Sequence, residues 1–379
     1  MTSTKTSPVR RVRVELGERS YNIVIGHGLL SQAGNEITQA LGTRRHAGPA
    51  RPTGKAVIIT DSHVGPLYAG KVRTALRRAG IESEVIEVPA GEGSKSLRQA
   101  NRLLERMPGL GLDRQSFVVA LGGGVVGDLA GFVAATYLRG IAFVQVPSSL
   151  LAMVDSSVGG KTGVNLPQGK NLVGAFHQPR LVLADLALLK TLPERELRSG
   201  FAEVIKTAAI ADAVFFEWLE RNHQRVLALD KGAVAYAVRR CCALKAGVVG
   251  ADERESGLRA ILNFGHTIGH GLEALVEYEG LLHGEAVSLG MVCAVELSVK
   301  RAGLAPAAAE RLRELVVNSG LPARLGERYD LKPLRAVMKL DKKSRAGRLR
   351  FVLLSRLGQA VLSDAVTDRD IEEVVNVCR

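Results

Sequence analysis

Cysteine is scarce in this chain, and it is not arranged for cross-linking. The 379 residues include only four cysteines, Cys241, Cys242, Cys293 and Cys378, and none forms a C-x-x-C pair. Because the adjacent Cys241 and Cys242 would make a poor disulfide or chelating pair, the sequence predicts neither a disulfide scaffold nor a cysteine-held metal. Reduced cysteines indicate an intracellular protein, and we expect a cytoplasmic location.

An uninterrupted apolar run of membrane-spanning length is also missing. The longest apolar tract, Phe117–Leu138, is broken by Asp128 and several glycines. This composition favours a turn followed by a helix over a span. The N-terminal segment is polar and basic and has no apolar stretch of the signal-peptide kind. We therefore expect no membrane partner.

Aromatic residues make up only 4% of the chain, whereas the formal net charge is +13. Nucleic-acid binding usually needs clustered Lys and Arg together with a known module or exposed aromatics. The basic residues here are scattered, so we interpret them as a solvated surface that attracts small anions. No nucleic-acid partner is expected. A basic DNA-binding protein is the non-enzyme alternative, and salt-sensitive binding to duplex DNA would support it.

The hydrophobic pattern divides the chain near residues 186–192. Short apolar runs alternate with helical patterns from residue 55 to about 185, which is typical of an α/β domain with a parallel sheet. After Pro193 the patterns are mostly helical, beginning with one long helix over Glu196–Glu220. We predict a Rossmann-like α/β nucleotide-binding domain over 1–188 and a mainly α-helical, metal- and substrate-binding domain over 189–379.

A glycine-rich turn is the first candidate binding site. The β-branched run Phe117–Leu121 leads into Gly122–Gly127, which matches G-x-G-x-x-G before a helical pattern. Such a turn exposes backbone N–H groups to phosphate. No acidic residue follows about 20 positions later, so we assign the ribose contacts to Asp61 and Glu92 instead. A turn that needs glycine only for close packing is the alternative.

Histidines form the second candidate site. His266 and His270 are four residues apart on one helical face, and His283 follows in a second histidine motif. Glu203 and Lys206 lie in an otherwise apolar helical segment, where charges are costly unless they are paired or bound. Glu203, His266 and His283 would leave one position of a zinc ion open, as in catalytic sites. A helical ion pair beside core histidines is the alternative.

Basic and amide side chains form a third set. Two further glycine-rich turns are predicted to carry Lys161 and Lys170-Asn171. Together these groups would suit a substrate that carries both phosphate and carboxylate. The set comprises Arg139, Lys161, Lys170, Asn171, Lys206, Lys245, Arg259, Asn263, Lys342 and Lys343.

Six motifs follow one another in uninterrupted order: GGGVVGDLAGF, VDSSVGGKTGVN, GKNLVGAFHQP, TLPERELRSGFAEVIK, NFGHTIGH and LLHGEAV. Together they resemble the 3-dehydroquinate synthase family of sugar-phosphate cyclases. The resemblance covers about residues 9 to 365, and its later motifs are specific to that family.

The resemblance implies an enzyme that uses NAD and a divalent metal, Zn²⁺ or Co²⁺, in an active site between the two domains. In the family, 3-deoxy-D-arabino-heptulosonate 7-phosphate becomes 3-dehydroquinate and phosphate, a step of the shikimate pathway to aromatic amino acids. The reaction combines oxidation by NAD, β-elimination of phosphate, reduction by the same cofactor and an intramolecular aldol. Members are generally homodimers.

The resemblance also implies residue roles. The metal ligands would be Glu203, His266 and His283. NAD would be held by Asp61, Glu92, Lys95, Gly123, Gly124, Val125, Val126, Gly127, Asp128, Ser148, Ser149, Lys161, Lys170 and Thr191. Catalytic and substrate contacts would come from Asp155, Lys161, Asn171, Lys206, Lys245, Arg259, Asn263, His270 and one of Lys342 or Lys343. Arg139 would reach in from the partner subunit.

Two departures from the family's usual motifs are visible. Ser148 and Ser149 stand where threonines are common, and Met153 stands where glutamine is frequent. Two rival enzymes share the plan. One is a metal-dependent polyol dehydrogenase, which has no need of a carboxylate clamp such as Lys245 with Arg259. The other is a sister sugar-phosphate cyclase, including an aminoshikimate-type synthase.

Overall fold

The protein consists of two compact units. The computed structural model describes residues 9–42, 54–275, 280–326 and 350–379. The first unit comprises Met1–Leu192 with Lys245–Arg254, and the second comprises Pro193–Leu244 with Glu255–Arg379. The predicted boundary at 188 falls four residues before the end of the first segment. The prediction also placed Lys245–Arg254 in the second domain, whereas this segment packs with the first unit.

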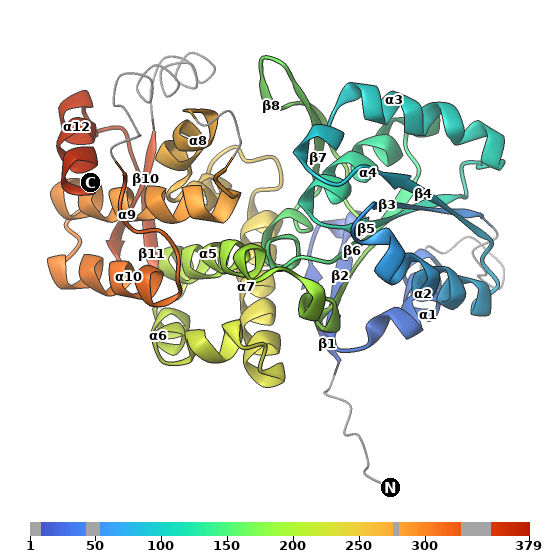
Figure 1. Ribbon diagram of the computed structural model, residues 1–379, viewed down its shortest axis with the longest axis horizontal. Coiled ribbons are helices and arrows are strands. Elements are labelled where there is room, and N and C mark those ends of the chain that lie inside the picture. Colours follow the sequence, from blue (N-terminus) through green and yellow to red (C-terminus); the bar gives the residue numbers. More distant parts are fainter. Residues whose placement is uncertain (1–8, 43–53, 276–279, 327–349) are drawn as a thin grey trace, which may run out of the picture. The chain divides into compact units, whose positions relative to one another are not determined.

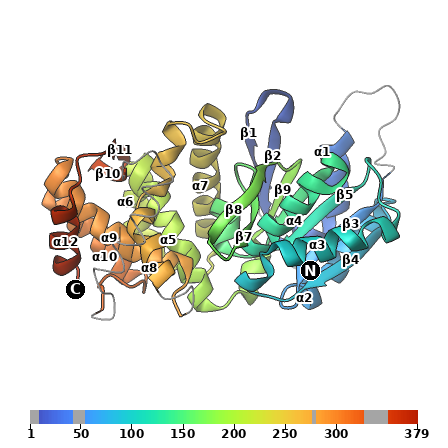
Figure 2. The same cartoon turned by 90° about the horizontal axis from the view of Figure 1, so that it is seen from above.

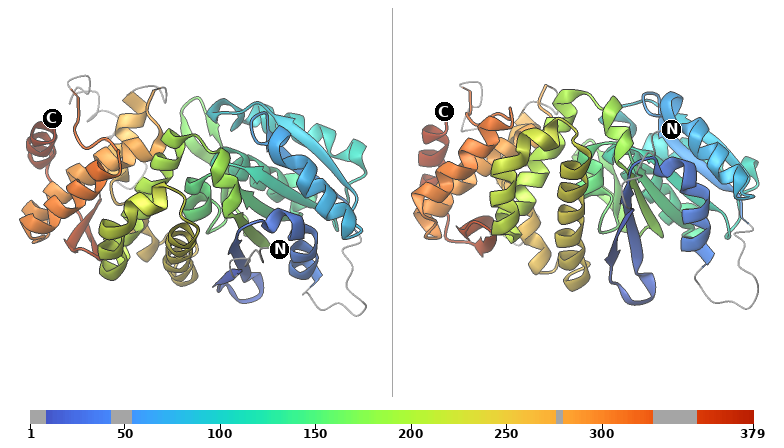
Figure 3. Two further views of the ribbon diagram at one scale, coloured as in Figure 1. Left: turned by 60° about the horizontal axis from the view of Figure 1, so that its bottom comes forward. Right: turned by 90° about the horizontal axis from the view of Figure 1, so that it is seen from below.

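A seven-stranded sheet forms the centre of the first unit, in the order β1-β2-β9-β6-β5-β3-β4. Only β1 is antiparallel to its neighbour, and the other pairs are parallel. Figure 3 shows β1 and β2 in dark blue at one edge of the sheet. The strands are β1 (Arg10–Val14), β2 (Tyr21–Gly26), β3 (Ala56–Asp61), β4 (Ser83–Val88), β5 (Phe117–Gly122), β6 (Ala142–Pro147) and β9 (Leu181–Asp185).

Helices cover both faces of this sheet (Figure 1). Alternate strand residues such as Val57 and Val118 pack with Leu103 and Leu129 in one buried cluster under α3 and α4. The chain runs from β3 out to the edge strand β4 and then returns to β5 on the other side of β3. This reversal makes a topological switch point between β3 and β5, where open α/β sheets bind ligands. The helices are α1 (Ala33–Gly42), α2 (Gly65–Arg78), α3 (Leu97–Arg106) and α4 (Gly124–Thr136).

A separate antiparallel hairpin, β7 (Lys161–Leu166) and β8 (Gly169–Phe176), packs beside α4 (Figure 2). The sequence predicted glycine-rich turns that carry Lys161 and Lys170-Asn171. Gly159 and Gly160 do have the positive φ of a turn, but Lys161 begins β7 directly after them, and Lys170 and Asn171 lie within β8. Gly163 and Gly174 face each other across the ladder, and a Cβ on Gly174 would lie 2.2 Å from the Thr162 carbonyl oxygen. Glycine is used here for close strand approach.

Short helical turns connect these elements. They are Gly17–Arg19, Leu29–Gln32, η3 (Glu92–Ser94), Pro108–Leu110, Tyr137–Arg139, the π-helical turn η6 (Ala152–Ser156), η7 (Leu186–Thr191) and, in the second unit, η8 (Leu258–Asn263).

The second unit is mainly helical and packs around α9, whose residues are mostly buried. Helices α5, α8, α10 and α12 and strand β10 all contact α9. The predicted fold class, an α/β domain followed by a mainly helical one, is confirmed. The elements are α5 (Glu194–Ala211), α6 (Ala213–Leu227), α7 (Lys231–Ala251), α8 (His266–Leu275), α9 (His283–Arg301), α10 (Pro306–Asn318), β10 (Phe351–Arg356), β11 (Gln359–Ser363) and α12 (Asp368–Val377). The part of α7 from Lys245 onward belongs to the first unit.

The prediction of a single helix over Glu196–Glu220 was wrong, because Asp212 separates two helices, α5 and α6. This residue has extended backbone angles, and its Oδ1 accepts the N–H of Phe215 at 3.0 Å as the N-cap of α6. Its Oδ2 also accepts a hydrogen bond from Arg240 Nε at 2.8 Å. A carboxylate that caps a helix N-terminus can end one helix and begin the next, even where the apolar pattern continues. Among the described residues, no helix has the length and apolar character needed to cross a membrane.

Asp370 anchors the C-terminal helix to α9. Its side chain is 1% exposed and accepts hydrogen bonds from Arg301 Nε and Nη2 at 3.0 and 2.8 Å. The Nζ of Lys300 lies 2.8 Å from Oδ1, and Thr367 completes a capping box at the start of α12. Hydrogen bonds from Arg301 and Lys300 hold the pKa of Asp370 well below its ordinary value.

We expect Asp370→Asn to lower the free energy of unfolding at pH 7 by about 2 kcal/mol, because the charge-assisted bonds are lost. The pKa of an aspartate in the unfolded chain is about 3.9, so this stabilisation is complete above that pH. It is lost as the pH falls toward the lower folded pKa. Urea unfolding of both proteins should therefore show a difference at pH 7 that shrinks below about pH 4. Asp368→Asn, at an exposed position of the same helix, is the control; an equal loss in both variants would contradict the prediction.

Candidate metal and nucleotide sites

Three metal-binding side chains converge in the second unit. Glu203 lies on α5, His266 begins α8 and His283 begins α9. Oε1 of Glu203 is 3.6 Å from Nε2 of His266 and 3.6 Å from Nε2 of His283. The three ligand atoms all lie within 4.8 Å of one another. A tetrahedral zinc with bonds of about 2.0–2.2 Å places its ligands roughly 3.3–3.6 Å apart, so this donor set fits a divalent cation.

Glycines let these three helices approach closely enough to bring the ligands together. A Cβ on Gly290 of α9 would lie 1.9 Å from the carbonyl oxygen of Gly265, just before His266. A Cβ on Gly284, next to His283, would lie 1.8 Å from the carbonyl oxygen of Ser199 on α5. Neither position has room for a larger side chain, because the contact atoms are backbone. The glycines of NFGHTIGH and HGE therefore set the ligand spacing.

The second nitrogen of each histidine ring has its own partner. Nδ1 of His266 is 3.1 Å from the carbonyl oxygen of Phe264, so it carries the proton and leaves the Nε2 lone pair toward Glu203. Nδ1 of His283 is 3.4 Å from Oε1 of Glu273, a residue on α8 that is 5% exposed. Carboxylates and carbonyls in this position orient metal-binding histidines. Glu273 was missed by the sequence reasoning, although an acid in the apolar run GLEAL, seven residues after His266, was a signal.

Glu203 and His266 are buried, His283 is partly exposed, and the electrostatics of the cluster are asymmetric. The ammonium of Lys206 forms an ion pair with Glu203, and both residues are 1% exposed. Burial, together with Lys206, lowers the pKa of His266 to about 3. Burial also lowers the pKa of His283, but hydrogen bonds to Glu203 and Glu273 outweigh it and raise the pKa to about 10. A buried carboxylate thus holds two imidazoles and one ammonium within reach of one another.

Other predicted residues of the second unit lie on nearby elements. His270 is exposed one turn after His266, with ring centroids 5.1 Å apart. Arg259 and Asn263 lie on η8; Arg259 is 2% exposed, and Asn263 Nδ2 donates to Glu255 Oε1 at 2.8 Å. Lys342 and Lys343 lie outside the described residues.

Residues predicted to hold a cofactor follow the carboxyl ends of five strands in the first unit. Asp61 ends β3, and Glu92 and Lys95 follow β4. The glycine turn with Asp128 follows β5, Ser148 and Ser149 follow β6, and Thr191 follows β9. Because these strands are parallel, their carboxyl ends meet at one edge of the sheet, which is the ligand edge of open α/β folds.

Gly122 and Gly123 are adjacent in the glycine turn, but their surroundings differ. A Cβ on Gly122 would lie 2.6 Å from Cβ of Val126, so packing excludes a side chain there. At Gly123, the N-cap of α4, the nearest atom to such a Cβ is Ser149 Oγ at 3.7 Å, and φ is −76°. Neither packing nor backbone angle requires glycine at this position. The remaining reason is close approach of a ligand to the N-terminus of α4.

Several of these side chains already have protein partners. Asp61 Oδ1 accepts the N–H groups of His63 and Val64 at 2.9 Å each. Nζ of Lys95 is 2.5 Å from Oδ2 of Asp128, and burial raises the pKa of Asp128 more than Lys95 lowers it. Thr191 Oγ1 is 2.6 Å from the hydroxyl of Tyr68, a contact that the sequence did not reveal.

The predicted substrate residues of the first unit are brought together in part. Lys245 is buried, and its Nζ donates to the carbonyl oxygen of Asp155 at 2.7 Å and pairs with its carboxylate. Lys161 begins β7, and Asn171 lies on β8 with a left-handed φ of 58°. Arg139 is exposed in the turn after α4, with φ of 68°.

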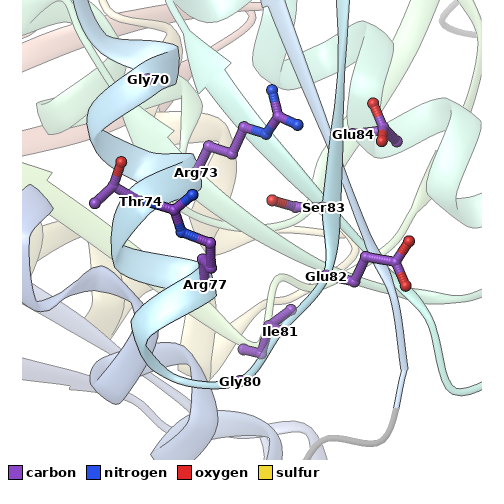
Figure 4. A pocket seen from close by; sticks show the side chains of 9 residues that line it. All are labelled: Gly70, Arg73, Thr74, Arg77, Gly80, Ile81, Glu82, Ser83 and Glu84. Carbon is purple, nitrogen blue, oxygen red and sulfur yellow. The ribbon is translucent and has the colours of Figure 1, made fainter.

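A surface hollow of the first unit contains none of the predicted residues (Figure 4). It is lined by the second half of α2 and the start of β4, including Arg73, Arg77, Glu82 and Glu84. Because it lies at the amino end of β4, it is at the opposite edge of the sheet from Glu92 and Lys95.

Family comparisons agree with the motifs. The profile of the 3-dehydroquinate synthase N-terminal domain matches residues 85–199, and that of the C-terminal domain matches residues 200–344. This chain belongs to the 3-dehydroquinate synthase family. A 3-dehydroquinate synthase of Desulforamulus reducens is 48% identical over 366 residues, which cover 96% of this chain and 99% of the relative. The resemblance seen in the sequence is confirmed.

Solved structures of 3-dehydroquinate synthase relatives share the whole fold. ValA, the 2-epi-5-epi-valiolone synthase of Streptomyces hygroscopicus with NAD⁺ and Zn²⁺ bound, is 29% identical with a TM-score of 0.84. The match covers 96% of this chain and 98% of that one. A 2-deoxy-scyllo-inosose synthase with carbaglucose-6-phosphate, NAD⁺ and Co²⁺ is 25% identical, with a TM-score of 0.85 and coverage of 98% and 100%.

Proposed function

We propose that this chain is an enzyme that converts 3-deoxy-D-arabino-heptulosonate 7-phosphate to 3-dehydroquinate and phosphate, with NAD and Zn²⁺ or Co²⁺. The observation that carries the proposal is the cluster of Glu203, His266 and His283, with Lys206 beside it, in a chain of this family. Lys245 and Arg259 supply the positive charge that a substrate carboxylate needs, which favours this reaction over that of a cyclase acting on a substrate without one.

We assign a role to each residue from its chemistry. When bound, the cation would polarise a substrate hydroxyl and carbonyl, and NAD would take up and return a hydride. Lys206 and His270, next to the cluster, would hold and move protons. Lys161, Asn171 and Asn263 would bind the phosphate. Lys245 and Arg259 would bind the carboxylate, and Asp155 neutralises the buried Lys245 before substrate arrives.

NAD would lie at the carboxyl edge of the sheet. The N-terminus of α4 would receive its phosphates, because backbone N–H groups and the helix dipole favour anions there. The other contacts would come from Asp61, Glu92, Lys95, Asp128, Ser148, Ser149, Lys161, Lys170 and Thr191. A cytoplasmic homodimer, in which Arg139 of the partner subunit reaches the substrate, completes the proposal. Sedimentation of the purified protein tests the dimer.

Phosphate release tests the reaction. The protein is incubated with the heptulosonate phosphate, catalytic NAD⁺ and Zn²⁺ while NADH absorbance is followed. Release of phosphate without net NADH, abolished by a chelator, is the expected result. Stoichiometric NADH without phosphate would instead identify a polyol dehydrogenase. Activity only with a sugar phosphate that lacks the carboxylate would identify a sister cyclase.

Glu273→Gln should weaken cation binding without removing a ligand. The amide keeps the shape of Glu273 but loses the negative charge that orients the ring of His283 and raises its basicity, so the dissociation constant should rise about tenfold. Competition with a coloured chelator measures it directly, without catalysis. Glu296→Gln is the control. Glu296 lies elsewhere on α9, and its carboxylate pairs with Arg313 of α10. Equal affinities in the two variants would remove the role of Glu273.

A further inference from the structure

Asn165 lies opposite a bulge in the hairpin of β7 and β8. Val164 pairs with Val173 and Leu166 pairs with Gly169, so the register shifts between them. On β7 only Asn165 lies between these pairs, whereas β8 has Lys170, Asn171 and Leu172. Bulges of this kind redirect side chains and often occur beside active sites.

Asn165 makes three hydrogen bonds at this bulge. Its backbone N–H donates to the carbonyl oxygen of Lys95 at 2.8 Å, next to a parallel bridge with Ser96. Its Nδ2 donates to Oε1 of Glu92 at 2.7 Å. Its Oδ1 accepts the backbone N–H of Asn171 at 2.9 Å. One half-buried amide thus connects the segment after β4 with the bulge on β8.

Both ends of this connection carry proposed ligand contacts, whereas Asn165 itself has none. Glu92, Lys95 and Lys170 are assigned to NAD, and Asn171 to the substrate phosphate. We propose that Asn165 is a positioning residue that links the cofactor segment Glu92–Lys95 to the substrate-binding bulge. The inference rests on the proposed function.

The physical reason is the hydrogen bond that Asn165 makes with the backbone of the bulge. Asn171 has a left-handed φ of 58°, a conformation that asparagine adopts more readily than most non-glycine residues. The side chain of Asn165 accepts from that same N–H. Cofactor bound at Glu92 would therefore restrain Asn165 and, through it, Asn171. Coupling between two sites is reciprocal, so substrate should also tighten NAD⁺ binding.

The test replaces Asn165 with aspartate. Asn165→Asp keeps an acceptor for Asn171 but removes the donor to Glu92 and puts two carboxylates in contact. We expect the dissociation constant for NAD⁺ and the KM for the heptulosonate phosphate each to rise at least about tenfold, with a smaller change in kcat. In a Glu92→Gln background the new amide at position 92 can donate to the new carboxylate at position 165. In that background, Asn165→Asp should raise the NAD⁺ dissociation constant and the KM by less than about threefold.

A matched control is available on α3. Asn101 Nδ2 donates to Glu105 Oε1 at 2.8 Å on an exposed surface, so Asn101→Asp repeats the chemical change away from the hairpin. It should leave NAD⁺ affinity and KM unchanged. If Asn165→Asp does not fold, Asn165→Ala, which adds no charge, should still raise both constants.

The outcomes separate the inference from the function on which it rests. A wild-type protein that binds NAD⁺ and releases phosphate, with Asn165→Asp matching Asn101→Asp, would overturn the role of Asn165 alone. Equal effects of Asn165→Asp in both Glu92 backgrounds would also overturn it. A wild-type protein that binds no NAD⁺ would overturn the proposed function and this inference together.

Discussion

Replacing His283 with alanine is expected to remove both tight cation binding and turnover. His283 contributes one of three ligand atoms around Glu203, and its ring is the ligand that Glu273 orients. Losing one of three protein ligands should weaken cation binding by roughly a thousandfold, about 4 kcal/mol. Phosphate release should fall by at least a similar factor, because the substrate hydroxyl is no longer polarised.

His283 is a better target than Glu203 for this experiment. Its side chain is 29% exposed, whereas the side chain of Glu203 is 1% exposed and is paired with the buried Lys206. Removing Glu203 would leave a buried ammonium without its counter-charge, which costs about 3–5 kcal/mol of stability. A loss of activity in a Glu203 variant could therefore reflect unfolding.

Cation content, cation affinity and phosphate release are measured on His283→Ala, with circular dichroism to check folding. His223→Ala is the control, because His223 is a buried histidine on α6 in the same unit and belongs to neither ligand group. His283→Ala protein that keeps its cation affinity and its rate would rule out the assignment of this cluster as the metal site.

Gly123→Ala should weaken NAD⁺ binding without loss of stability, whereas Gly122→Ala should lower the stability of the protein. At Gly123 the backbone angles suit alanine and the nearest atom is 3.7 Å from the new methyl group, so the melting temperature should change little. The methyl group would point into the space proposed for the NAD phosphates, and the NAD⁺ dissociation constant should rise at least tenfold, about 1.4 kcal/mol.

At Gly122 the methyl group would instead meet Val126 at 2.6 Å. Overpacking of this kind costs about 1–3 kcal/mol of stability. Calorimetry and a binding titration on both variants separate the two effects. Unchanged NAD⁺ affinity in a folded Gly123→Ala protein would show that the turn needs glycine for packing only, which is the alternative considered from the sequence.

Short-range patterns explain the parts of the fold that the sequence predicts. The alternation of β-branched runs with helical patterns between residues 55 and 185 is local, and the observed strands β3, β4, β5, β6 and β9 follow it. Where a side chain competes with the pattern, the prediction was wrong. Asp212 caps a new helix inside an apolar run, and no periodicity reports a cap that depends on Arg240 from another helix.

Close backbone approach was the second source of error. Lys161 and Lys170-Asn171 were predicted to lie in glycine-rich turns, but they lie in β7 and β8, where Gly163 and Gly174 face each other across the ladder. The same uncertainty applies at Gly122 and Gly123, which look alike in the sequence. Only the positions of Val126 and Ser149 distinguish a packing glycine from one that faces open space.

The sequence by itself determined the fold class, the two-domain plan, the glycine turn and the candidate ligands, because periodicity and i, i+4 spacing act over a few residues. Tertiary structure alone revealed the residues that support the predicted ones. The 3.4 Å contact of Glu273 with His283 and the bonds of Asn165 with Glu92 and Asn171 join separate elements. Such pairs depend on helix packing and strand register, and neither is encoded in the spacing of the residues that meet.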